Sequence, residues 1–252
     1  MILRQIFLAT LSIFLVLGYD MEFAAAEDCS ACVQLTSHTF DKILPKFKAV
    51  LVKFDVVYPY GDKHKEYTDV AVSTKDSPDL LIAEVGVKDF GNKDNQDLAK
   101  RFGIKPDDYP TLLLFVNGRK EPYRFVAEKD DEFTANNIKR FIKKKTSLYL
   151  GLPGCIEKLD QLADEFKANE KDRKEIFNKA KLFEETLPEE HREAAKVYIK
   201  LMAKILEKGD VFVQTEQTRL ENLLKGKLSV EKKKTMEERR NILQSFMFRD
   251  EL

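Results

Sequence analysis

The sequence contains few of the residue types that most often take part in catalysis or metal binding. Among its 252 residues there are no tryptophans, three histidines and three cysteines. The histidines, His38, His64 and His191, lie far apart, and zinc sites need clustered cysteine and histidine ligands, so we expect no metal site. The formal net charge is zero, which provides no long-range field for binding nucleic acid or an anionic membrane. No Asn-x-Ser/Thr triplet is present, so N-glycosylation is not expected.

The chain does have a distinctive beginning. Arg4 precedes an apolar run over residues 6–18, and residues 24–26 are all alanine. A basic start, a short apolar segment and a small-residue cleavage site are typical of a secretory signal peptide, which we predict over residues 1–26. The alternative is a membrane anchor, but the run is short for crossing the hydrocarbon core. We therefore expect no membrane insertion.

The other end of the chain is equally informative. The last four residues are Arg249, Asp250, Glu251 and Leu252, which differ from the Lys-Asp-Glu-Leu retrieval signal by one exchange between basic residues. Four residues match by chance easily, but their combination with a signal peptide is far more specific. We therefore predict a resident of the endoplasmic reticulum lumen whose C-terminus binds a retrieval receptor.

The longest β-type segment lies at residues 49–61. It is a nearly uninterrupted apolar run rich in β-branched residues, which predicts a central strand covered by helices on both faces. Tyr58, Pro59, Tyr60 and Gly61 end it, and we call these four residues the tyrosine turn. In proteins built on an open α/β sheet, the catalytic or ligand-binding residues usually lie in the loop after such a strand. Here that loop carries no nucleophile, metal ligand or phosphate cradle.

The order of elements around this strand predicts an α/β thioredoxin-like domain over residues 27–146. Crossover helices make the early strands parallel, and Asn117-Gly118 predicts a hairpin that makes a later strand antiparallel. Pro110 stands just before the fourth strand, so we identify it as a candidate cis-proline. The expected strands are 33–36, 49–57, 80–86, 111–116 and 123–126, and the expected helices are 37–47 (capped by Ser37), 63–75, 97–102 and 134–145.

A change of pattern near residues 147–155 predicts a linker, because two glycines and a proline fall there. No strand pattern follows it. Residues 156–248 are expected to form a small all-α domain of five helices. These are expected at residues 156–166, 171–185, 189–208, 210–225 and from a cap at Ser229 onward.

Cys29 and Cys32 form the sharpest motif in the chain and allow two interpretations. A Cys-x-x-Cys pair in an oxidising compartment can exchange disulfides. In a thioredoxin-like oxidoreductase, however, the pair follows the central strand at a helix N-terminus, where the thiol pKa is lowered. Here that position is the tyrosine turn, and the cysteines precede the first strand. A local tether is the other interpretation, and Cys155 is expected to be a buried structural thiol.

Four motifs carry a resemblance to a known family. They read KFDVVYPYG, LLIAEVGV, YLGLPGC and YIKLMAKIL, at residues 53–61, 80–87, 149–155 and 198–206. With them, the chain resembles the small protein-disulfide-isomerase-related chaperones of the endoplasmic reticulum lumen, of the Windbeutel type. The similarity extends over essentially the whole chain after the predicted signal peptide.

The resemblance implies a redox-inactive thioredoxin domain that forms a homodimer, joined to a helical domain that helps to handle secretory proteins. It implies client contacts at Asp55 and at the tyrosine turn; the alternative is that the two rings only close the end of the sheet. It also implies dimer contacts around the first strand, where Thr36 replaces a usual acidic residue; the positions are Val33, Leu35, Thr36 and Ser37. A Cys-x-x-Cys pair ahead of the first strand occurs in the escort branch of this family.

The leading hypothesis is therefore a non-enzymatic chaperone or escort factor, without a cofactor, that binds secretory client proteins. The alternative is a weak thiol-disulfide oxidoreductase using Cys29 and Cys32. A third hypothesis is a structural adaptor that joins other lumenal chaperones. Tyrosine side chains favour the first, because they provide flat amphipathic contact area at low entropic cost.

Overall fold

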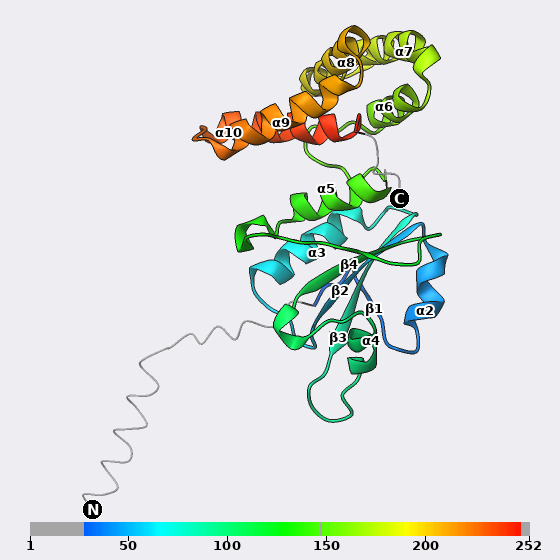
Figure 1. The fold of residues 1–252 in the computed structure, drawn as a ribbon, viewed down its shortest axis with the longest axis vertical. Coiled ribbons are helices and arrows are strands. Elements are labelled where there is room, and N and C mark those ends of the chain that lie inside the picture. The colour runs from blue at the N-terminus through cyan, green and yellow to red at the C-terminus, as the bar shows by residue number, and fades with distance from the viewer. Residues whose placement is uncertain (1–27, 147, 248–252) are drawn as a thin grey trace, which may run out of the picture.

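The computed structural model describes residues 28–146 and 148–247, which form an α/β domain and a domain made of helices alone (Figure 1). The expected fold is confirmed: a thioredoxin-like α/β domain is followed by a five-helix domain. The predicted signal peptide and retrieval signal lie outside the described residues. Within the described part, no helix combines the length and apolar character that a membrane crossing requires.

The α/β domain is built on a five-stranded sheet in the order β1-β3-β2-β4-β5. Its central strand is β2 (Ala49–Val56), which pairs in parallel with β3 (Leu80–Val87) and antiparallel with β4 (Thr111–Val116). Two short edge strands complete the sheet, β1 (Val33–Gln34) and β5 (Tyr123–Arg124). The segment predicted as the central strand is therefore confirmed, and so are the parallel and antiparallel pairings.

Helices cover both faces of the sheet, which explains why β2 is apolar along most of its length. The helices α3 (Asp62–Thr74) and α5 (Ala135–Thr146) pack on one face. The helices α2 (Phe40–Ile43) and α4 (Gln96–Arg101) pack on the other. Successive side chains of a strand point to opposite faces. Thus β2 supplies Ala49 and Leu51 to the first core and Val50, Val52 and Phe54 to the second.

The first strand and helix differ from the prediction. The strand expected at residues 33–36 covers only β1, and the helix expected at 37–47 is split into α2 and a 3-10 turn, η1 (Leu44–Lys46). Pro45 cannot donate a main-chain hydrogen bond, which accounts for the break. The prediction that Ser37 caps this helix was wrong. Its hydroxyl instead donates to Asp97 Oδ1 at 2.6 Å.

The helical domain contains the five predicted helices. They are α6 (Glu157–Ala168), α7 (Arg173–Thr186), α8 (Glu189–Lys208), α9 (Val211–Lys225) and α10 (Val230–Gln244). The cap predicted at Ser229 is confirmed, because its side chain accepts a hydrogen bond from the main-chain N–H of Lys232. Side chains from all five helices share one core, which includes Phe166, Ala180, Tyr198, Leu201, Met202, Leu220 and Ile242.

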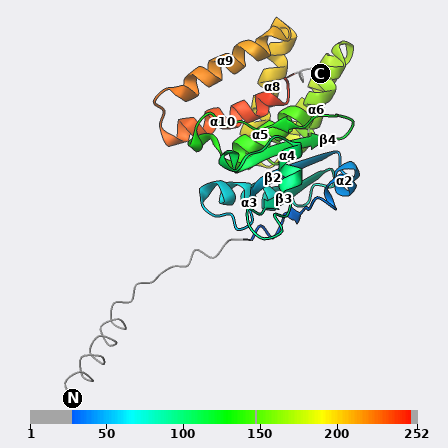
Figure 2. The ribbon, with the colours of Figure 1, turned by 60° about the horizontal axis from the view of Figure 1, so that its bottom comes forward.

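The two domains pack against each other, and α10 lies beside α5 (Figure 1 and Figure 2). Lys143, in the last turn of α5, reaches into the helical domain. Its Nζ lies 2.7 Å from Asp160 Oδ2 and donates to Ser245 Oγ at 2.8 Å. Both charged side chains are buried. The domain contact therefore includes an ion pair shielded from solvent.

The predicted linker also follows a packed course. Leu150 and Leu152 are buried, and Tyr149 donates a hydrogen bond to the carbonyl of Cys155. Gly154 has a φ of +81°, and a Cβ there would lie 2.8 Å from the Cβ of Glu238 in α10. Glycine is thus required both by the backbone conformation and by the close approach of α10.

Candidate functional site

The tyrosine turn connects the end of β2 to the start of α3. Tyr58 is 70% exposed and Tyr60 is 80% exposed. Gly61 has a φ of +85°, a conformation that glycine adopts without strain, and it directly precedes the helix. Since both rings stand in solvent, they do not serve to close the end of the sheet. The turn presents two large amphipathic side chains between the central strand and α3.

A cleft lies on the α3 side of the turn and has a volume of about 1010 Å³. Its lining includes Tyr60 and Pro110, and the Tyr109–Pro110 peptide bond is cis, which confirms the assignment of Pro110. Asp55 also lines this cleft and accepts a hydrogen bond from the main-chain N–H of Val56 at 2.8 Å. The structure thus brings together Asp55, the tyrosine turn and the cis-proline, as the sequence predicted.

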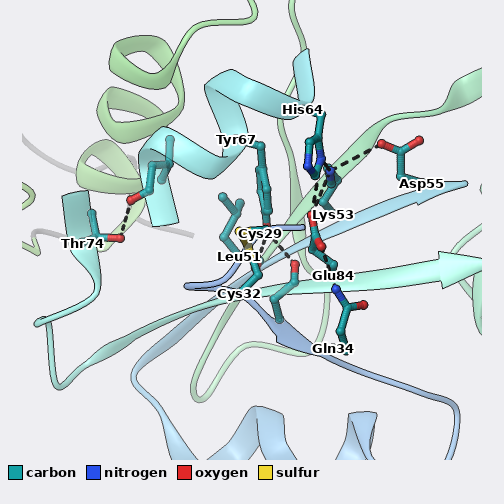
Figure 3. Close-up of a disulfide and its surroundings, with 12 residues drawn as sticks. Cys29, Cys32, Gln34, Leu51, Lys53, Asp55, His64, Tyr67, Thr74 and Glu84 are labelled. Carbon is teal, nitrogen blue, oxygen red and sulfur yellow. Dashed lines mark hydrogen bonds and ion pairs between the residues drawn. A yellow bond between two sulfur atoms is a disulfide. The ribbon is translucent and has the colours of Figure 1, made fainter. Parts of the chain in front are cut away.

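Beneath the turn lies a group that the sequence reasoning missed, which we call the buried charge cluster: Lys53, Asp55, His64 and Glu84 (Figure 3). The Lys53 ammonium is 2.9 Å from Glu84 Oε1 and 3.5 Å from Asp55 Oδ2. It is also 2.6 Å from Nδ1 of His64, which accepts a hydrogen bond when it carries no proton. Burial raises the pKa of the Asp55 carboxyl above its usual range, and Lys53 opposes that rise.

The sequence did contain a signal for this cluster. Lys53 is the single basic residue of β2, and Glu84 is the single acidic residue of β3; Asp55 is the other charged residue of these two largely apolar strands. The two positions are directly paired in the parallel register. Gln34 of β1 extends the row by donating to Glu84 Oε2 at 2.8 Å. A charge of each sign in adjacent buried strands predicts an ion pair, because an isolated buried charge is costly.

Cys29 and Cys32 form a disulfide, with a Cα–Cα distance of 5.3 Å. Cys29 is buried in the same core as Leu51 and Tyr67, on the α3 face of the sheet (Figure 3). The disulfide is therefore a packed local tether that precedes β1, and neither cysteine belongs to the turn that begins α3. The cysteines come close to Glu84, but both sulfurs are committed to the disulfide and Glu84 is paired with Lys53, so these residues do not fit a metal site.

The residues expected at a dimer interface are not equally available. Val33 and Thr36 are exposed and Ser37 is half-buried, whereas the Leu35 side chain is only 2% exposed and packs in the core with Phe40. Leu35 can therefore contribute to a partner contact only through its main chain. The dimer interface itself stays a prediction.

Cys155 behaves as expected for a structural thiol. It is partly buried next to the interdomain ion pair, where Lys143 Nζ lies 3.4 Å from its sulfur. Burial raises the pKa of the Cys155 thiol to about 11, so the thiolate is scarce at neutral pH. This cysteine is poorly suited to disulfide exchange.

Comparison with known proteins agrees with this geometry. A family model described as "ERp29, N-terminal domain" matches residues 27–153, and one described as "Endoplasmic reticulum protein ERp29, C-terminal domain" matches residues 154–246. The chain is 34% identical over 239 residues to protein windbeutel of Drosophila melanogaster, which covers 93% of this chain and 92% of that protein. It is 31% identical over 225 residues to protein disulfide-isomerase 1 of Dictyostelium discoideum, covering 86% and 60% respectively.

Solved structures resemble the α/β domain. A mutant thioredoxin from Halobacterium salinarum aligns with 46% of this chain and 92% of its own, with a TM-score of 0.35 and 22% sequence identity. The zinc-bound form of human ERp44 aligns with 45% of this chain and 30% of its own, with a TM-score of 0.35 and 20% identity.

Proposed function

The chain belongs to the ERp29 family, and on this premise we propose that it is a non-enzymatic folding or escort factor of the endoplasmic reticulum lumen. It binds exposed apolar or aromatic segments of secretory client proteins at the tyrosine turn and Asp55, with help from the helical domain. The single observation that carries this proposal is the exposure of Tyr58 and Tyr60 at the carboxyl end of the central strand. Large rings held in solvent by a rigid scaffold are effective anchors for a flexible partner.

The double variant Tyr58→Ala/Tyr60→Ala tests the proposal. We expect it to bind client segments at least about 30-fold more weakly, equivalent to about 2 kcal/mol, because two anchoring rings are removed. Client export from the endoplasmic reticulum should fall in parallel. The melting temperature should not change, since both rings are largely exposed.

The matched control is Tyr58→Phe/Tyr60→Phe, which keeps both rings and removes only the hydroxyls. It should retain most of the binding and most of the export. If the alanine pair exports clients as well as the unaltered protein does, the turn has no part in the mechanism.

The second candidate function is weak thiol-disulfide exchange, which the partial exposure of Cys32 in the Cys29–Cys32 disulfide favours. The double variant Cys29→Ser/Cys32→Ser separates the two functions. Because the cysteines are three positions apart, the disulfide closes a short loop, and its loss should cost about 2 kcal/mol of unfolding free energy. We expect client export to persist. Insulin reduction by the unaltered protein, abolished in this variant, would establish the redox function instead.

We further propose that the protein is a homodimer through Val33, Thr36 and Ser37, which present side chains at the β1 edge. An edge strand with unpaired main-chain groups favours such pairing. Sedimentation equilibrium of the unaltered protein and of a Val33→Glu variant tests this proposal, since a charge at an exposed interface position should shift a dimer toward monomer. The retrieval receptor at Arg249–Leu252 and other lumenal chaperones are proposed as additional partners.

A further inference from the structure

An apolar groove lies on the other side of the tyrosine turn from the cleft described above. It has a volume of about 510 Å³ and lies between the end of β3 and α4. Its lining is mostly apolar and includes Val56, Tyr58, Val87, Phe90, Ile104 and Tyr109. Phe90 is 58% exposed. A large exposed aromatic ring beside an open apolar groove marks a surface that can take up an apolar side chain from a partner.

The charges near this groove are largely neutralised by one another. Lys88 lines the groove, but its ammonium is 2.6 Å from Asp94 Oδ2. Asp89 and Lys100 add one charge of each sign. The groove therefore selects for apolar character and has no strong preference for either sign of charge.

The cleft on the α3 side has the opposite character, and we call it the acidic cleft. Its lining includes two lysines, Lys63 and Lys65, and one of them is paired, with Lys63 Nζ 2.8 Å from Asp130 Oδ1. Against these stand six carboxylates: Asp55, which is paired with the buried Lys53, and Asp62, Glu66, Asp69, Asp130 and Asp131. A concave surface lined by one excess sign of charge attracts the other sign and repels its own.

The groove and the acidic cleft meet at the base of the tyrosine turn. Val56, Pro106 and Tyr109 line both of them. Tyr58 lines the groove and Tyr60 lines the cleft. A single extended peptide segment that crosses the turn can therefore place one side chain in the groove and another in the acidic cleft, while it contacts the rings of Tyr58 and Tyr60.

We propose that this face recognises extended client segments that carry an apolar side chain for the groove and, a few residues away, a basic side chain for the acidic cleft. The inference rests on the proposed function and specifies its substrate class. The groove supplies the apolar contact, and the excess of carboxylates supplies the charge complementarity that selects lysine or arginine over glutamate. The formal net charge of the whole chain is zero, so this selection is local to the face.

Peptide binding to the full-length protein tests the proposal, with labelled 12-residue peptides and fluorescence anisotropy as the readout. One peptide carries a phenylalanine and two lysines, a second replaces the lysines by glutamates, and a third replaces the phenylalanine by serine. We expect the first to bind at least about tenfold more tightly than either of the others. Its advantage over the glutamate peptide should shrink at high salt, because the cleft is open to solvent.

Two sets of variants test the groove and the acidic cleft separately. Phe90→Ser should weaken the phenylalanine-lysine peptide about fivefold, whereas Phe90→Leu should retain the affinity because it keeps an apolar side chain. Asp62→Asn/Asp131→Asn should weaken the same peptide and reduce its preference over the glutamate peptide. Val126→Ser is a control, because Val126 is 71% exposed but lines neither hollow.

Two outcomes would overturn the inference: equal affinity for the lysine and glutamate peptides, or no effect of Phe90→Ser on any peptide. The tyrosine variants keep this failure distinct from a failure of the proposed function. If Tyr58→Ala/Tyr60→Ala loses peptide binding while the groove and cleft variants do not, the turn binds clients without this selectivity. If the tyrosine pair binds as well as the unaltered protein, the proposed function itself is wrong.

Discussion

The variant Lys53→Met is expected to lose about 3–5 kcal/mol of unfolding free energy. Lys53 is fully buried in β2, and its ammonium balances the carboxylates of Glu84 and Asp55. Methionine keeps most of the side-chain volume and removes the positive charge. Two carboxylates would then share a buried site without that counter-charge, which is the costly way to break a buried ion pair. Urea unfolding at pH 8, followed by far-ultraviolet circular dichroism, measures the loss.

The control is the double variant Lys53→Met/Glu84→Leu, which replaces both members of the pair by apolar residues. Replacing a whole buried pair is often close to neutral, because both desolvation costs disappear together. We expect the double variant to be more stable than Lys53→Met by at least about 2 kcal/mol. A double variant no more stable than the single one would show that Lys53 acts through packing alone.

The sequence predicts the architecture well because most of it follows from local patterns. Residues of β2 alternate between two cores, so the run that they form must be apolar throughout, and that feature is visible without a structure. Ser229 is a helix cap by residue type and position, and the structure confirms it. The place of Pro110 before the fourth strand also makes it a candidate cis-proline, and the structure shows the Tyr109–Pro110 bond to be cis. These features depend on only a few neighbouring residues.

The features that the sequence reasoning missed depend on residues far apart in the chain. In the predicted helix 134–145, Ile138, Phe141 and Ile142 share one face, and the lysines at 143–145 that follow them are typical of a solvated helix end. Lys143 is buried nonetheless, because α10 and α6 cover it. The spacing of apolar residues along one helix does not indicate which other helix will cover its polar side chains. The groove beside the tyrosine turn likewise forms only when β3 and α4 come together.

The ion pair between Lys143 and Asp160 is the basis of the second prediction of a large loss of stability. In Asp160→Asn, the Lys143 ammonium would remain at a buried site without its counter-ion, which is now 2.7 Å away. Asp160 Oδ1 also accepts a hydrogen bond from Tyr198 at 2.6 Å and another from Ser245. We expect a loss of about 3–5 kcal/mol, expressed as undocking of the domains and a lower melting temperature. Lys143→Met/Asp160→Leu is the matched control, and it should restore much of the stability.

Cys155 provides a direct readout of this undocking. Its thiol has a pKa raised to about 11 by burial at the domain contact, and the other two cysteines are held in the disulfide. When the domains separate, the thiol gains solvent and its pKa falls toward the ordinary value, so alkylation at pH 8 should accelerate at least about tenfold in Asp160→Asn. Ser245→Ala, which removes two hydrogen bonds, one from Lys143 and one to Asp160, but no charge, should change the rate far less. An unchanged alkylation rate together with an unchanged melting temperature would show that other contacts, such as the hydrogen bonds of Arg140 with Asn241 and Gln244, hold the domains together.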